Sequence, residues 1–473
     1  MQRDEQAAHA CHWGHWAIAC ALMAAILLAP ALWNGFPLLQ YDTGGYLARW
    51  FEGYLVPSRP AMYGLALLSG VNLDFWPVVA AQAAVTIWVL GALFRELGLG
   101  DRPFLLLAAV AALSAFTTLP WLTSILLTDL FAGLAVIALH LLVFGRTVGR
   151  IQRAGLVLLI AFSAATHGAT LLVLAGVIAG GYALALLWPH VVSPRRVRIA
   201  AVALVLGVIM TLTANWLVSS RFGFPPGGYG IAFGRMLQDG IVTRYLDDHC
   251  PDPALRLCPH KRTLPRNADA FLWGNSVFNR LGRFDGMGEE MRTIVLGSLR
   301  AYPLQQAGAA LSAALRQLVK VASGEGVISQ MWHTYAIVGR YTPQAMPAMQ
   351  AARQQHGKLS FEAINVVHVP FGLIALFLLP VLVFVGRGHE VLGPVSLLAT
   401  TVGFALLANA VICGVLSNPH DRYGARLIWL APLTLTLVPV SLRISQRTRA
   451  GKSAALSVSV PEPLPALRDS RSS

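Results

Sequence analysis

Runs of about 20 apolar residues recur along this chain, and they constrain its fold more than any other feature. Each run is long enough to cross the roughly 30 Å hydrocarbon core of a bilayer as a helix. A helix satisfies its own backbone hydrogen bonds, whereas an open sheet in hydrocarbon cannot. Of the 473 residues, 56% are hydrophobic and only 12% are charged, about half the charged share of a soluble domain. The sequence therefore predicts an all-α, polytopic transmembrane helical protein with about 10 spans.

Ten ranges have the length and composition of a span. The apolar stretch 154–189 is too long for one helix, and Thr166-His167-Gly168 offers a natural break, so we divide it into a short fifth and a full sixth span. The first range exceeds the core of a secretory signal and no clear cleavage site follows it, so we expect it to stay uncleaved. The predicted spans are 16–33, 76–94, 103–119, 125–144, the two parts of 154–189, 199–218, 366–385, 391–413 and 427–442.

The charge is strongly positive, with 36 Lys and Arg against 22 Asp and Glu and a net charge of +14. In a soluble protein this excess would suggest nucleic acid. Here much of it sits in short loops and the tail, so we expect contact with anionic membrane lipid and no nucleic-acid partner. Positively charged loops stay in the cytoplasm. Arginines crowd the loops on the side of both termini and are sparse in the opposite short loops, so both termini are predicted to be cytoplasmic.

This topology divides the chain into four parts. Residues 1–218 form an N-terminal transmembrane core with an acidic motif in its first outer loop, and 219–365 form a large extracytoplasmic loop or helical region between spans seven and eight. Residues 366–442 hold the C-terminal transmembrane helices, and 443–473 are rich in Ser, Pro and Arg and predicted to be a disordered cytoplasmic tail.

Two features stand out in the large polar region. Cys250 and Cys258 lie eight residues apart among prolines, and in an oxidising compartment we expect them to form a disulfide. Their spacing with the flanking histidines matches no common zinc site. The stretch from Met287 to Val321 has an amphipathic helical pattern. It could lie along the outer membrane surface or pack as a small helical domain.

Polar and ionisable groups gather at the span ends that this topology places outside. Ionisable side chains near membrane depth are costly, so each is a functional candidate. Arg422 and Arg426 stand four apart at a helix start and share one face, which suits an anionic group such as a phosphate. The candidates are Asp42 and Tyr46 after the first span, Arg59 and Tyr63 in the same loop, Asp129 just inside the fourth span, His167 between the fifth and sixth, and His420, Asp421, Arg422 and Arg426 between the ninth and tenth.

Each candidate also has a purely structural interpretation. Asp42 could cap a helix that begins at Thr43. Arg59 could be an interfacial anchor, and His167 could fill a helix break. Asp129, six residues into a helical run, could hydrogen-bond a neighbouring helix. The charged residues of 417–426 could pair among themselves.

Together the outer residues resemble the C-type (GT-C) membrane glycosyltransferases, such as the aminoarabinose transferases and the protein O-mannosyltransferases. That family carries an acidic motif in the first outer loop, followed in many bacterial members by a Lys-Pro-Pro-Leu-Tyr-like motif. Asp42 occupies the acidic position, and Arg59-Pro60-Ala61-Met62-Tyr63 is similar to the second motif with Arg in place of Lys. Thr43 follows Asp42 where the family often has a second acid, and 417–426 is unlike the better-known members.

The resemblance implies a GT-C-like fold in a multi-pass protein of the bacterial inner (plasma) membrane. It implies transfer of a sugar from a polyprenyl-phosphate-linked donor to a glycan or lipid acceptor on the extracytoplasmic face. Asp42 would be the catalytic base, Arg59 would contact the lipid phosphate, and Asp129 would orient the acceptor or a divalent metal. His167 is a further catalytic candidate, and the sequence leaves open whether a metal is needed.

Three other functions remain open from the sequence. A transporter or flippase for a lipid-linked or anionic solute would place charges near the midplane and show an internal repeat. A ligase or polymerase for lipid-linked glycans would rely on His167, His420 and Arg422 more than on Asp42. The chain could also be a non-catalytic assembly subunit.

Overall fold

The computed structural model describes residues 2–443, and this part of the chain is almost entirely helical. Among these residues, Leu38 and Ile125 form an isolated parallel β-bridge. All but the first residue of the predicted tail, 443–473, lies outside the described range. The all-α fold class predicted from the apolar runs is therefore confirmed.

A helix covers each predicted span. Six of them are long and apolar enough to cross a membrane, and three shorter apolar helices, Trp13–Leu27, Pro103–Phe116 and Asp129–Phe144, lie beside them. The count of about ten spans stays a prediction. The helices are α1 (Gln2–Leu27), α5 (Trp76–Glu96), α6 (Pro103–Phe116), α8 (Asp129–Phe144), α9 (Arg150–Thr166), α10 (Gly168–Leu187), α11 (Pro194–Ser219), α20 (Glu362–Gly386), α21 (Gly393–Leu416) and α22 (Asp421–Ile428), after which the helical span runs to Arg443.

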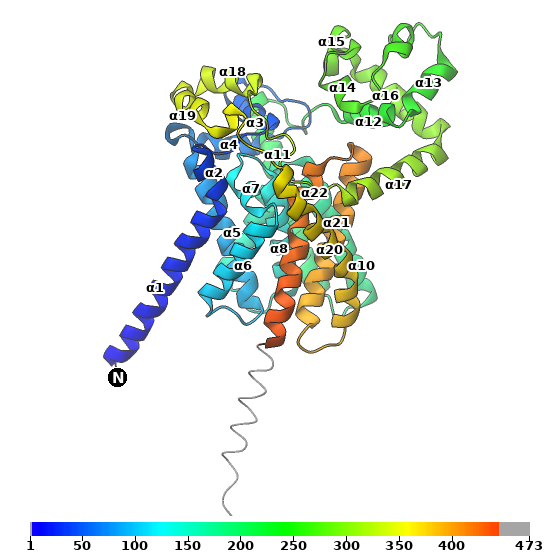
Figure 1. Cartoon of the computed structure of the whole chain (residues 1–473). Helices are drawn as coiled ribbons and strands as arrows, with labels where there is room; N and C mark the ends of the chain where they lie inside the picture. The colour runs from blue at the N-terminus through cyan, green and yellow to red at the C-terminus, as the bar shows by residue number, and fades with distance from the viewer. Residues whose placement is uncertain (1, 444–473) are drawn as a thin grey trace, which may run out of the picture.

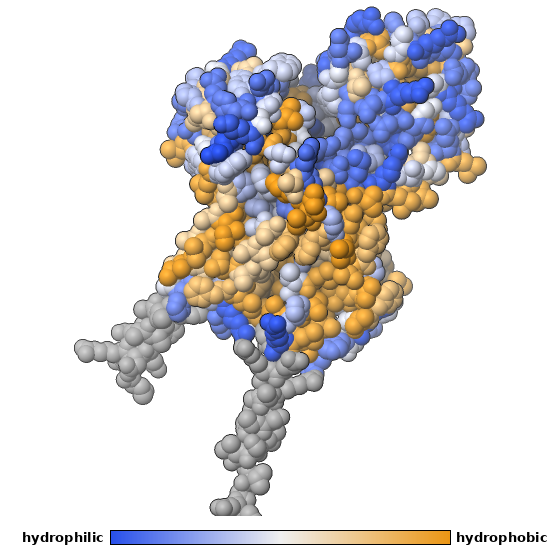
Figure 2. Space-filling model, viewed as in Figure 1, coloured by the Kyte–Doolittle hydropathy of each residue, from blue (hydrophilic) through white to orange (hydrophobic). Residues whose placement is uncertain are grey.

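These helices form an upright bundle whose outer surface is apolar (Figures 1 and 2). Figure 2 shows an orange band across the visible face of the bundle and hydrophilic residues at both ends. One end carries the short loops between α5 and α6, α8 and α9, α10 and α11, and α20 and α21. The other end, which we call the capped end, carries the remaining helices (Figure 1).

The capped end is built from short helices in two groups. The first lies over the N-terminal half of the bundle: α2 (Ala29–Asn34), α3 (Tyr41–Glu52), α4 (Met62–Leu68), α7 (Leu119–Ser124), α18 (Trp332–Tyr341) and α19 (Met346–Ala351), with 3-10 turns η1 (Val71–Leu73), η3 (Pro343–Ala345) and η4 (Arg353–His356). The second group, the lobe, comprises α12 (Gly228–Gln238), α13 (Ile241–His249), η2 (Cys258–Thr263), α14 (Ala268–Leu272), α15 (Val277–Arg280) and α16 (Arg283–Ala301), joined to the bundle by α17 (Pro303–Val319).

The region 219–365 thus forms two structures. The lobe has its own apolar core, which includes Phe233, Phe271 and Phe278. The later segment shares the core of the bundle instead, through residues such as Ile337 and Val338, and α18 packs on α3. Within the lobe, Cys250 and Cys258 form the predicted disulfide.

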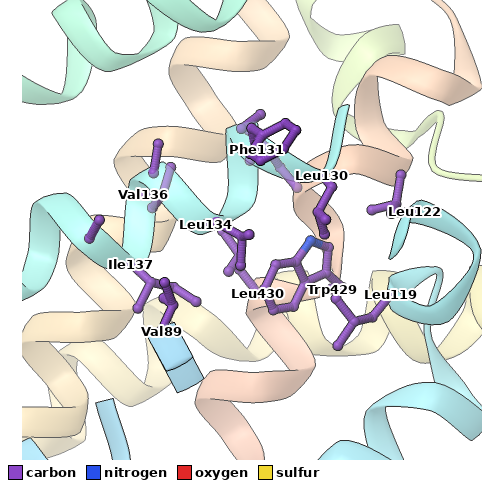
Figure 3. Close-up of a cluster of buried hydrophobic side chains, with 14 of the residues drawn as sticks. Val89, Leu119, Leu122, Leu130, Phe131, Leu134, Val136, Ile137, Trp429 and Leu430 are labelled. Atoms are coloured by element: carbon purple, nitrogen blue, oxygen red, sulfur yellow. The ribbon is translucent and has the colours of Figure 1, made fainter. Parts of the chain in front are cut away.

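The bundle is organised around α8. Every residue from Asp129 to Val143 is buried, so this helix is apolar on all sides because it touches other helices on all sides. Figure 3 shows its side chains packed with Trp429 and Leu430 of the last span. Trp429 fits because residue 133 is glycine: a Cβ there would stand 2.7 Å from the indole ring. This close packing fixes α8 against α22.

Two helix boundaries matter for the site. The break predicted at Thr166-His167-Gly168 is confirmed, because α9 ends at Thr166 and α10 begins at Gly168. The fourth predicted span, 125–144, begins four residues too early. Residues 125–128 are not helical and α8 starts at Asp129, because Leu38 bonds Ser124 and Leu126 through its backbone and the Gln82 amide donates to the carbonyls of Thr123 and Ile125.

We predict that Gly133→Ala lowers the thermal stability of the purified protein. The added methyl group overpacks against Trp429, and overpacking typically costs about 1–3 kcal/mol, more than the ~1 kcal/mol that Ala gains over Gly in a helix. Gly181→Ala in α10 is the matched control, since nothing lies within 4 Å of its Cβ position. Equal melting temperatures for the two variants in detergent would contradict this account of the α8–α22 contact.

Candidate functional site

Asp42 reaches the capped end from the first turn of α3. The helix begins at Tyr41, and Gln40 and Thr43 form its capping box: the Gln40 side chain accepts from the Asp42 N–H, and the Thr43 hydroxyl accepts from the Gln40 N–H. The alternative in which Asp42 caps a helix starting at Thr43 is therefore wrong. Since neighbours do the capping, the Asp42 carboxylate is left to interact with distant parts of the chain.

Arg422 joins the two predicted catalytic carboxylates. Its Nη1 donates to Asp42 Oδ2 at 2.7 Å, and its Nε donates to Asp129 Oδ2 at 2.6 Å. Asp42 Oδ1 accepts at 2.7 Å from Nη2 of Arg59. The side chains of Asp42, Arg59 and Arg422 are only 13–19% exposed, and that of Asp129 is 2% exposed. The sequence candidates from the first, second and last outer turns thus meet at one place, which we call the Arg422 cluster.

The two candidate tyrosines lie beneath this cluster. Tyr46 and Tyr63 are fully buried, with ring centroids 5.4 Å apart. Tyr63 donates its hydroxyl to Gln82 at 2.9 Å and packs edge-on against Phe131. The structure therefore gives Tyr63 a packing role under Asp42, and it forms no hydrogen bond to the members of the cluster.

Arg426 and His167 lie deeper, apart from Asp42. Arg426 is 0% exposed, and its Nε and Nη2 both donate to Asn409 Oδ1, at 3.1 and 2.7 Å. Its Nη1 lies 3.4 Å from Nδ1 of His167. Arg426 has no carboxylate within ion-pair distance among residues 2–443. His167 therefore supports a buried arginine and does not touch Asp42.

His420 belongs to a second group that sequence reasoning did not find. Its Nδ1 lies 2.7 Å from Glu325 Oε1 and its Nε2 lies 3.3 Å from Asp269 Oδ2 of the lobe. Glu325 Oε2 also accepts the Arg422 backbone N–H at 2.7 Å. The signal that could have found Glu325 is its setting, Gly324-Glu325-Gly326, in which both glycines adopt a positive φ that favours glycine.

Asp421 contacts the loop 320–325, which contains Glu325. Its Oδ1 accepts the Ala322 N–H at 3.0 Å, and its Oδ2 lies 3.3 Å from Nζ of Lys320. A Cβ at Gly424 would collide with the Lys320 carbonyl. Asp421 is thus a structural residue that docks the 320–325 loop on the start of α22.

A small pocket, partly open to solvent, adjoins the Arg422 cluster. Most of its wall is apolar. The rings of Trp121 and Phe361 pack there edge to face, with their centroids 4.7 Å apart. Its polar residues are Gln40, Thr118, Asp129, Glu325 and Arg422, and the remaining lining residues are Leu38, Trp121, Leu122, Ile125, Leu127, Gly324, Val327, Phe361 and Ala425. Its wall thus combines apolar side chains with the guanidinium of Arg422 and the carboxylates of Asp129 and Glu325.

The arginines of the cluster have N–H groups to spare. The cluster and Arg426 comprise three guanidinium groups against two carboxylates, and Glu325, which accepts from the Arg422 backbone and lines the pocket, is a third carboxylate nearby. Arg59 Nε and Arg422 Nη2 are buried and unpartnered within the described part of the chain. Buried N–H groups without an acceptor are costly, so both donors are suited to a ligand oxygen.

The pKa of Asp42 reflects this setting. Burial alone would raise it, but the charges and hydrogen bonds of Arg59 and Arg422 outweigh burial and hold the pKa well below its usual value. Asp42 is therefore ionised at neutral pH. A carboxylate this strongly paired is a weak base, so proton abstraction by Asp42 requires that the arginines first find another anion.

The two cluster carboxylates could offer oxygen ligands to a divalent metal. Each faces guanidinium groups instead, and no group of three or more His, Cys, Asp or Glu side chains with metal-binding geometry occurs in the part of the chain described. We therefore derive no step through a metal ion.

The fold and hydropathy define an all-α membrane protein with a buried ionic cluster at one end of its helix bundle. Comparison with known proteins adds no family to this class: the chain matches no family model, no curated protein and no solved structure.

We predict that protonated His420 stabilises the contact between the lobe and the bundle. Burial alone would lower the pKa of His420, but hydrogen bonds and charge from Asp269 and Glu325 raise it to about 9. The stabilisation is full below the usual pKa near 6.5 and is lost as pH rises through about 9. The melting temperature in detergent should fall over this interval, and His420→Gln should remove that fall.

The exposed His190→Gln serves as control and should keep the wild-type pH profile. If the melting temperatures of wild type and His420→Gln change with pH in the same way, the pairing of His420 does not contribute to stability.

Proposed function

We propose that this chain is a membrane glycosyltransferase that moves a sugar from a polyprenyl-phosphate donor to an acceptor hydroxyl at the capped end. The observation that carries the proposal is the Arg422 cluster beside an apolar pocket. A ligand that fills both must combine an anionic group with a hydrocarbon body. A lipid-linked phosphate has this combination, and its tail remains in the bilayer.

The phosphate would bind to Arg59 and Arg422. Both arginines have an unused buried N–H, and charge-assisted hydrogen bonds from arginine to phosphate are among the strongest in proteins. Asp129 holds the Nε of Arg422 and so orients its remaining donors. Asp129 acts as a positioning residue in this proposal.

Binding of the phosphate would also free the base. Asp42 now accepts hydrogen bonds from both arginines, so a donor phosphate that takes over these donors weakens their hold on the carboxylate. The pKa of Asp42 then rises toward that of a useful base. Donor binding and base activation would therefore be one event, which protects against proton transfer at an empty site.

The reaction balances with these groups alone. The acceptor hydroxyl gives its proton to Asp42 while its oxygen bonds to the anomeric carbon. The bond from that carbon to the phosphate oxygen breaks, and its electron pair leaves with the lipid phosphate. A phosphodiester with one negative charge becomes a phosphomonoester that can carry two, and hydrogen bonds from Arg59 and Arg422 stabilise this change.

We further propose that the capped end faces away from the cytoplasm of a bacterial inner membrane, with both termini on the cytoplasmic side. Two features support this orientation. The disulfide of the lobe requires an oxidising compartment. The loops at the opposite end are rich in arginine, as cytoplasmic loops are.

We predict that Asp42→Asn abolishes sugar transfer and at the same time strengthens binding of polyprenyl phosphate. The amide cannot accept the proton, and a positioned base typically contributes about 10²–10⁴-fold. Loss of the carboxylate also removes the internal competitor for Arg59 and Arg422. Transfer is measured with reconstituted protein and a panel of radiolabelled polyprenyl-phosphate sugars, and binding is measured with polyprenyl phosphate itself against uncharged polyprenol.

Matched variants make this test specific. Arg422→Gln should weaken polyprenyl phosphate binding by about 10–100-fold, the range expected for a lost charge-assisted bond. Asp101 and Arg150 are both exposed at the opposite end of the bundle. Asp101→Asn and Arg150→Gln should therefore change neither sugar transfer nor polyprenyl phosphate binding. If wild-type protein prefers polyprenyl phosphate over polyprenol by less than twofold, or if Asp42→Asn retains transfer, the proposal is wrong.

Sidedness is predicted separately. Glu289 in the lobe is 87% exposed, so Glu289→Cys should react with a membrane-impermeant maleimide in intact cells with a permeabilised outer membrane. Arg102→Cys, in the loop between α5 and α6, should react only after the inner membrane is disrupted. The reverse labelling pattern would contradict the proposed orientation, and it would leave the proposed reaction untested.

A further inference from the structure

Helix α17 carries an apolar stripe that the protein leaves uncovered. Leu304 is 87% exposed, Leu311 63% and Leu315 57%, and their spacing of seven and four residues places them on one face of the helix. Val319, 47% exposed, extends the stripe by another turn. Aligned exposed leucines on a soluble surface are a liability, so this face requires an apolar environment.

The opposite face of α17 is already fixed. Ala313 and Gln317 are buried, and Gly414 of α21 approaches so closely that a Cβ there would lie 2.8 Å from the Ala313 carbonyl oxygen. Arg235 of the lobe donates to the Ala309 carbonyl at 2.9 Å. The helix therefore cannot rotate to bury its leucines, and the stripe points away from the protein.

The position of α17 shows what the stripe meets. The helix packs on α21 near the capped end of that span and slants outward from the bundle toward the lobe (Figure 1). In Figure 2 the orange surface of the bundle continues along the underside of the lobe. The exposed stripe is thus continuous with the surface that faces lipid, through exposed residues of α21 such as Val411 and Leu416.

The flank of α17 is polar, as an interfacial helix requires. Ser312 is exposed, and Arg316 is 53% exposed although its Nη2 lies 3.9 Å from Asp239 Oδ1 of the lobe. Both residues lie between the leucine stripe and the buried face on the helix. A basic side chain at this position can extend to lipid headgroups while its stem covers apolar surface. Helices with one apolar and one basic polar side lie in the plane of the bilayer interface.

We infer that α17 lies in the lipid leaflet at the capped end, with Leu304, Leu311 and Leu315 among the acyl chains and Arg316 at the headgroups. The phospholipid leaflet is the partner of this surface. This assigns the two halves of the amphipathic stretch 287–321 to different environments. Its first half, α16, packs in the lobe through Met287, Met291 and neighbouring residues, and its second half rests on the membrane.

Helix α17 is bonded directly to the segment that carries the candidate site. The Gln317 side chain bonds the backbone of His420 in both directions, at 2.8 and 2.9 Å, and Lys320 pairs with Asp421. The residues after α17 lead directly to Glu325, which accepts from Arg422. A leaflet that carries α17 therefore also sets the depth of Arg422 relative to lipid phosphates, whatever reaction the site performs.

Fluorescence quenching at single labelled cysteines in the full-length protein tests the inference. The chain keeps its disulfide and the buried Cys413, and Cys11 and Cys20 are replaced by Ala. An environment-sensitive fluorophore is attached at Leu304→Cys, Leu311→Cys or Leu315→Cys, with Ser312→Cys and Arg316→Cys as matched controls on the same helix. The protein is reconstituted into vesicles of phosphatidylethanolamine and phosphatidylglycerol.

The stripe positions should be quenched by lipids that carry a nitroxide on the acyl chain and protected from aqueous iodide, and the two control positions should show the reverse. Quenching of the stripe by iodide would mean that it faces water. Protection from both quenchers would mean that protein covers it, and cross-linking between labelled copies would identify a second copy of the chain. Each of these three outcomes overturns the inference.

Discussion

The ion pairs of Arg422 with Asp42 and Asp129 hold the architecture together at the capped end. One guanidinium connects the first turn of α3, the first residue of α8 and the start of α22, which lie up to 380 residues apart in the chain. All three side chains are largely buried, and breaking a buried pair leaves an uncompensated charge that costs several kcal/mol. The position of each helix therefore depends on the same charges that are available for chemistry.

A second layer of contacts fixes this cluster to the rest of the molecule. Glu325 binds both His420 and the backbone of Arg422, and His420 in turn reaches Asp269 of the lobe. The lobe, the 320–325 loop and the last span thus meet in one hydrogen-bonded chain. These contacts orient Arg422 before any ligand arrives, and electrostatic stabilisation of a reaction depends on such preorganised donors.

The sequence predicted much of this arrangement because two of its signals are local. Apolar runs located the helices and the break at His167, and polar residues at span ends indicated which groups would meet: Asp42, Arg59, Asp129 and Arg422. The sequence could not predict which residues far apart in the chain would pair with one another. Nothing in the periodicity shows that Arg426 lies beneath Arg422 with Asn409 as its partner, or that Glu325 folds onto His420. The late start of α8 was also missed, because side-chain bonds from Gln82 and backbone bonds from Leu38 override its apolar pattern.

The geometry of the helix ends bears on the choice between transfer and transport. Asp42, Asp129 and Arg422 all lie in the first turn of helices α3, α8 and α22, so three helix N-termini converge on the cluster. Helix N-termini attract anions because their N–H groups and dipoles point outward. In the resting protein the two carboxylates occupy this positive field themselves. A transporter would need its charges near the middle of the spans, whereas an enzyme acting on an interfacial phosphate needs them where these residues lie, at the ends of the helices.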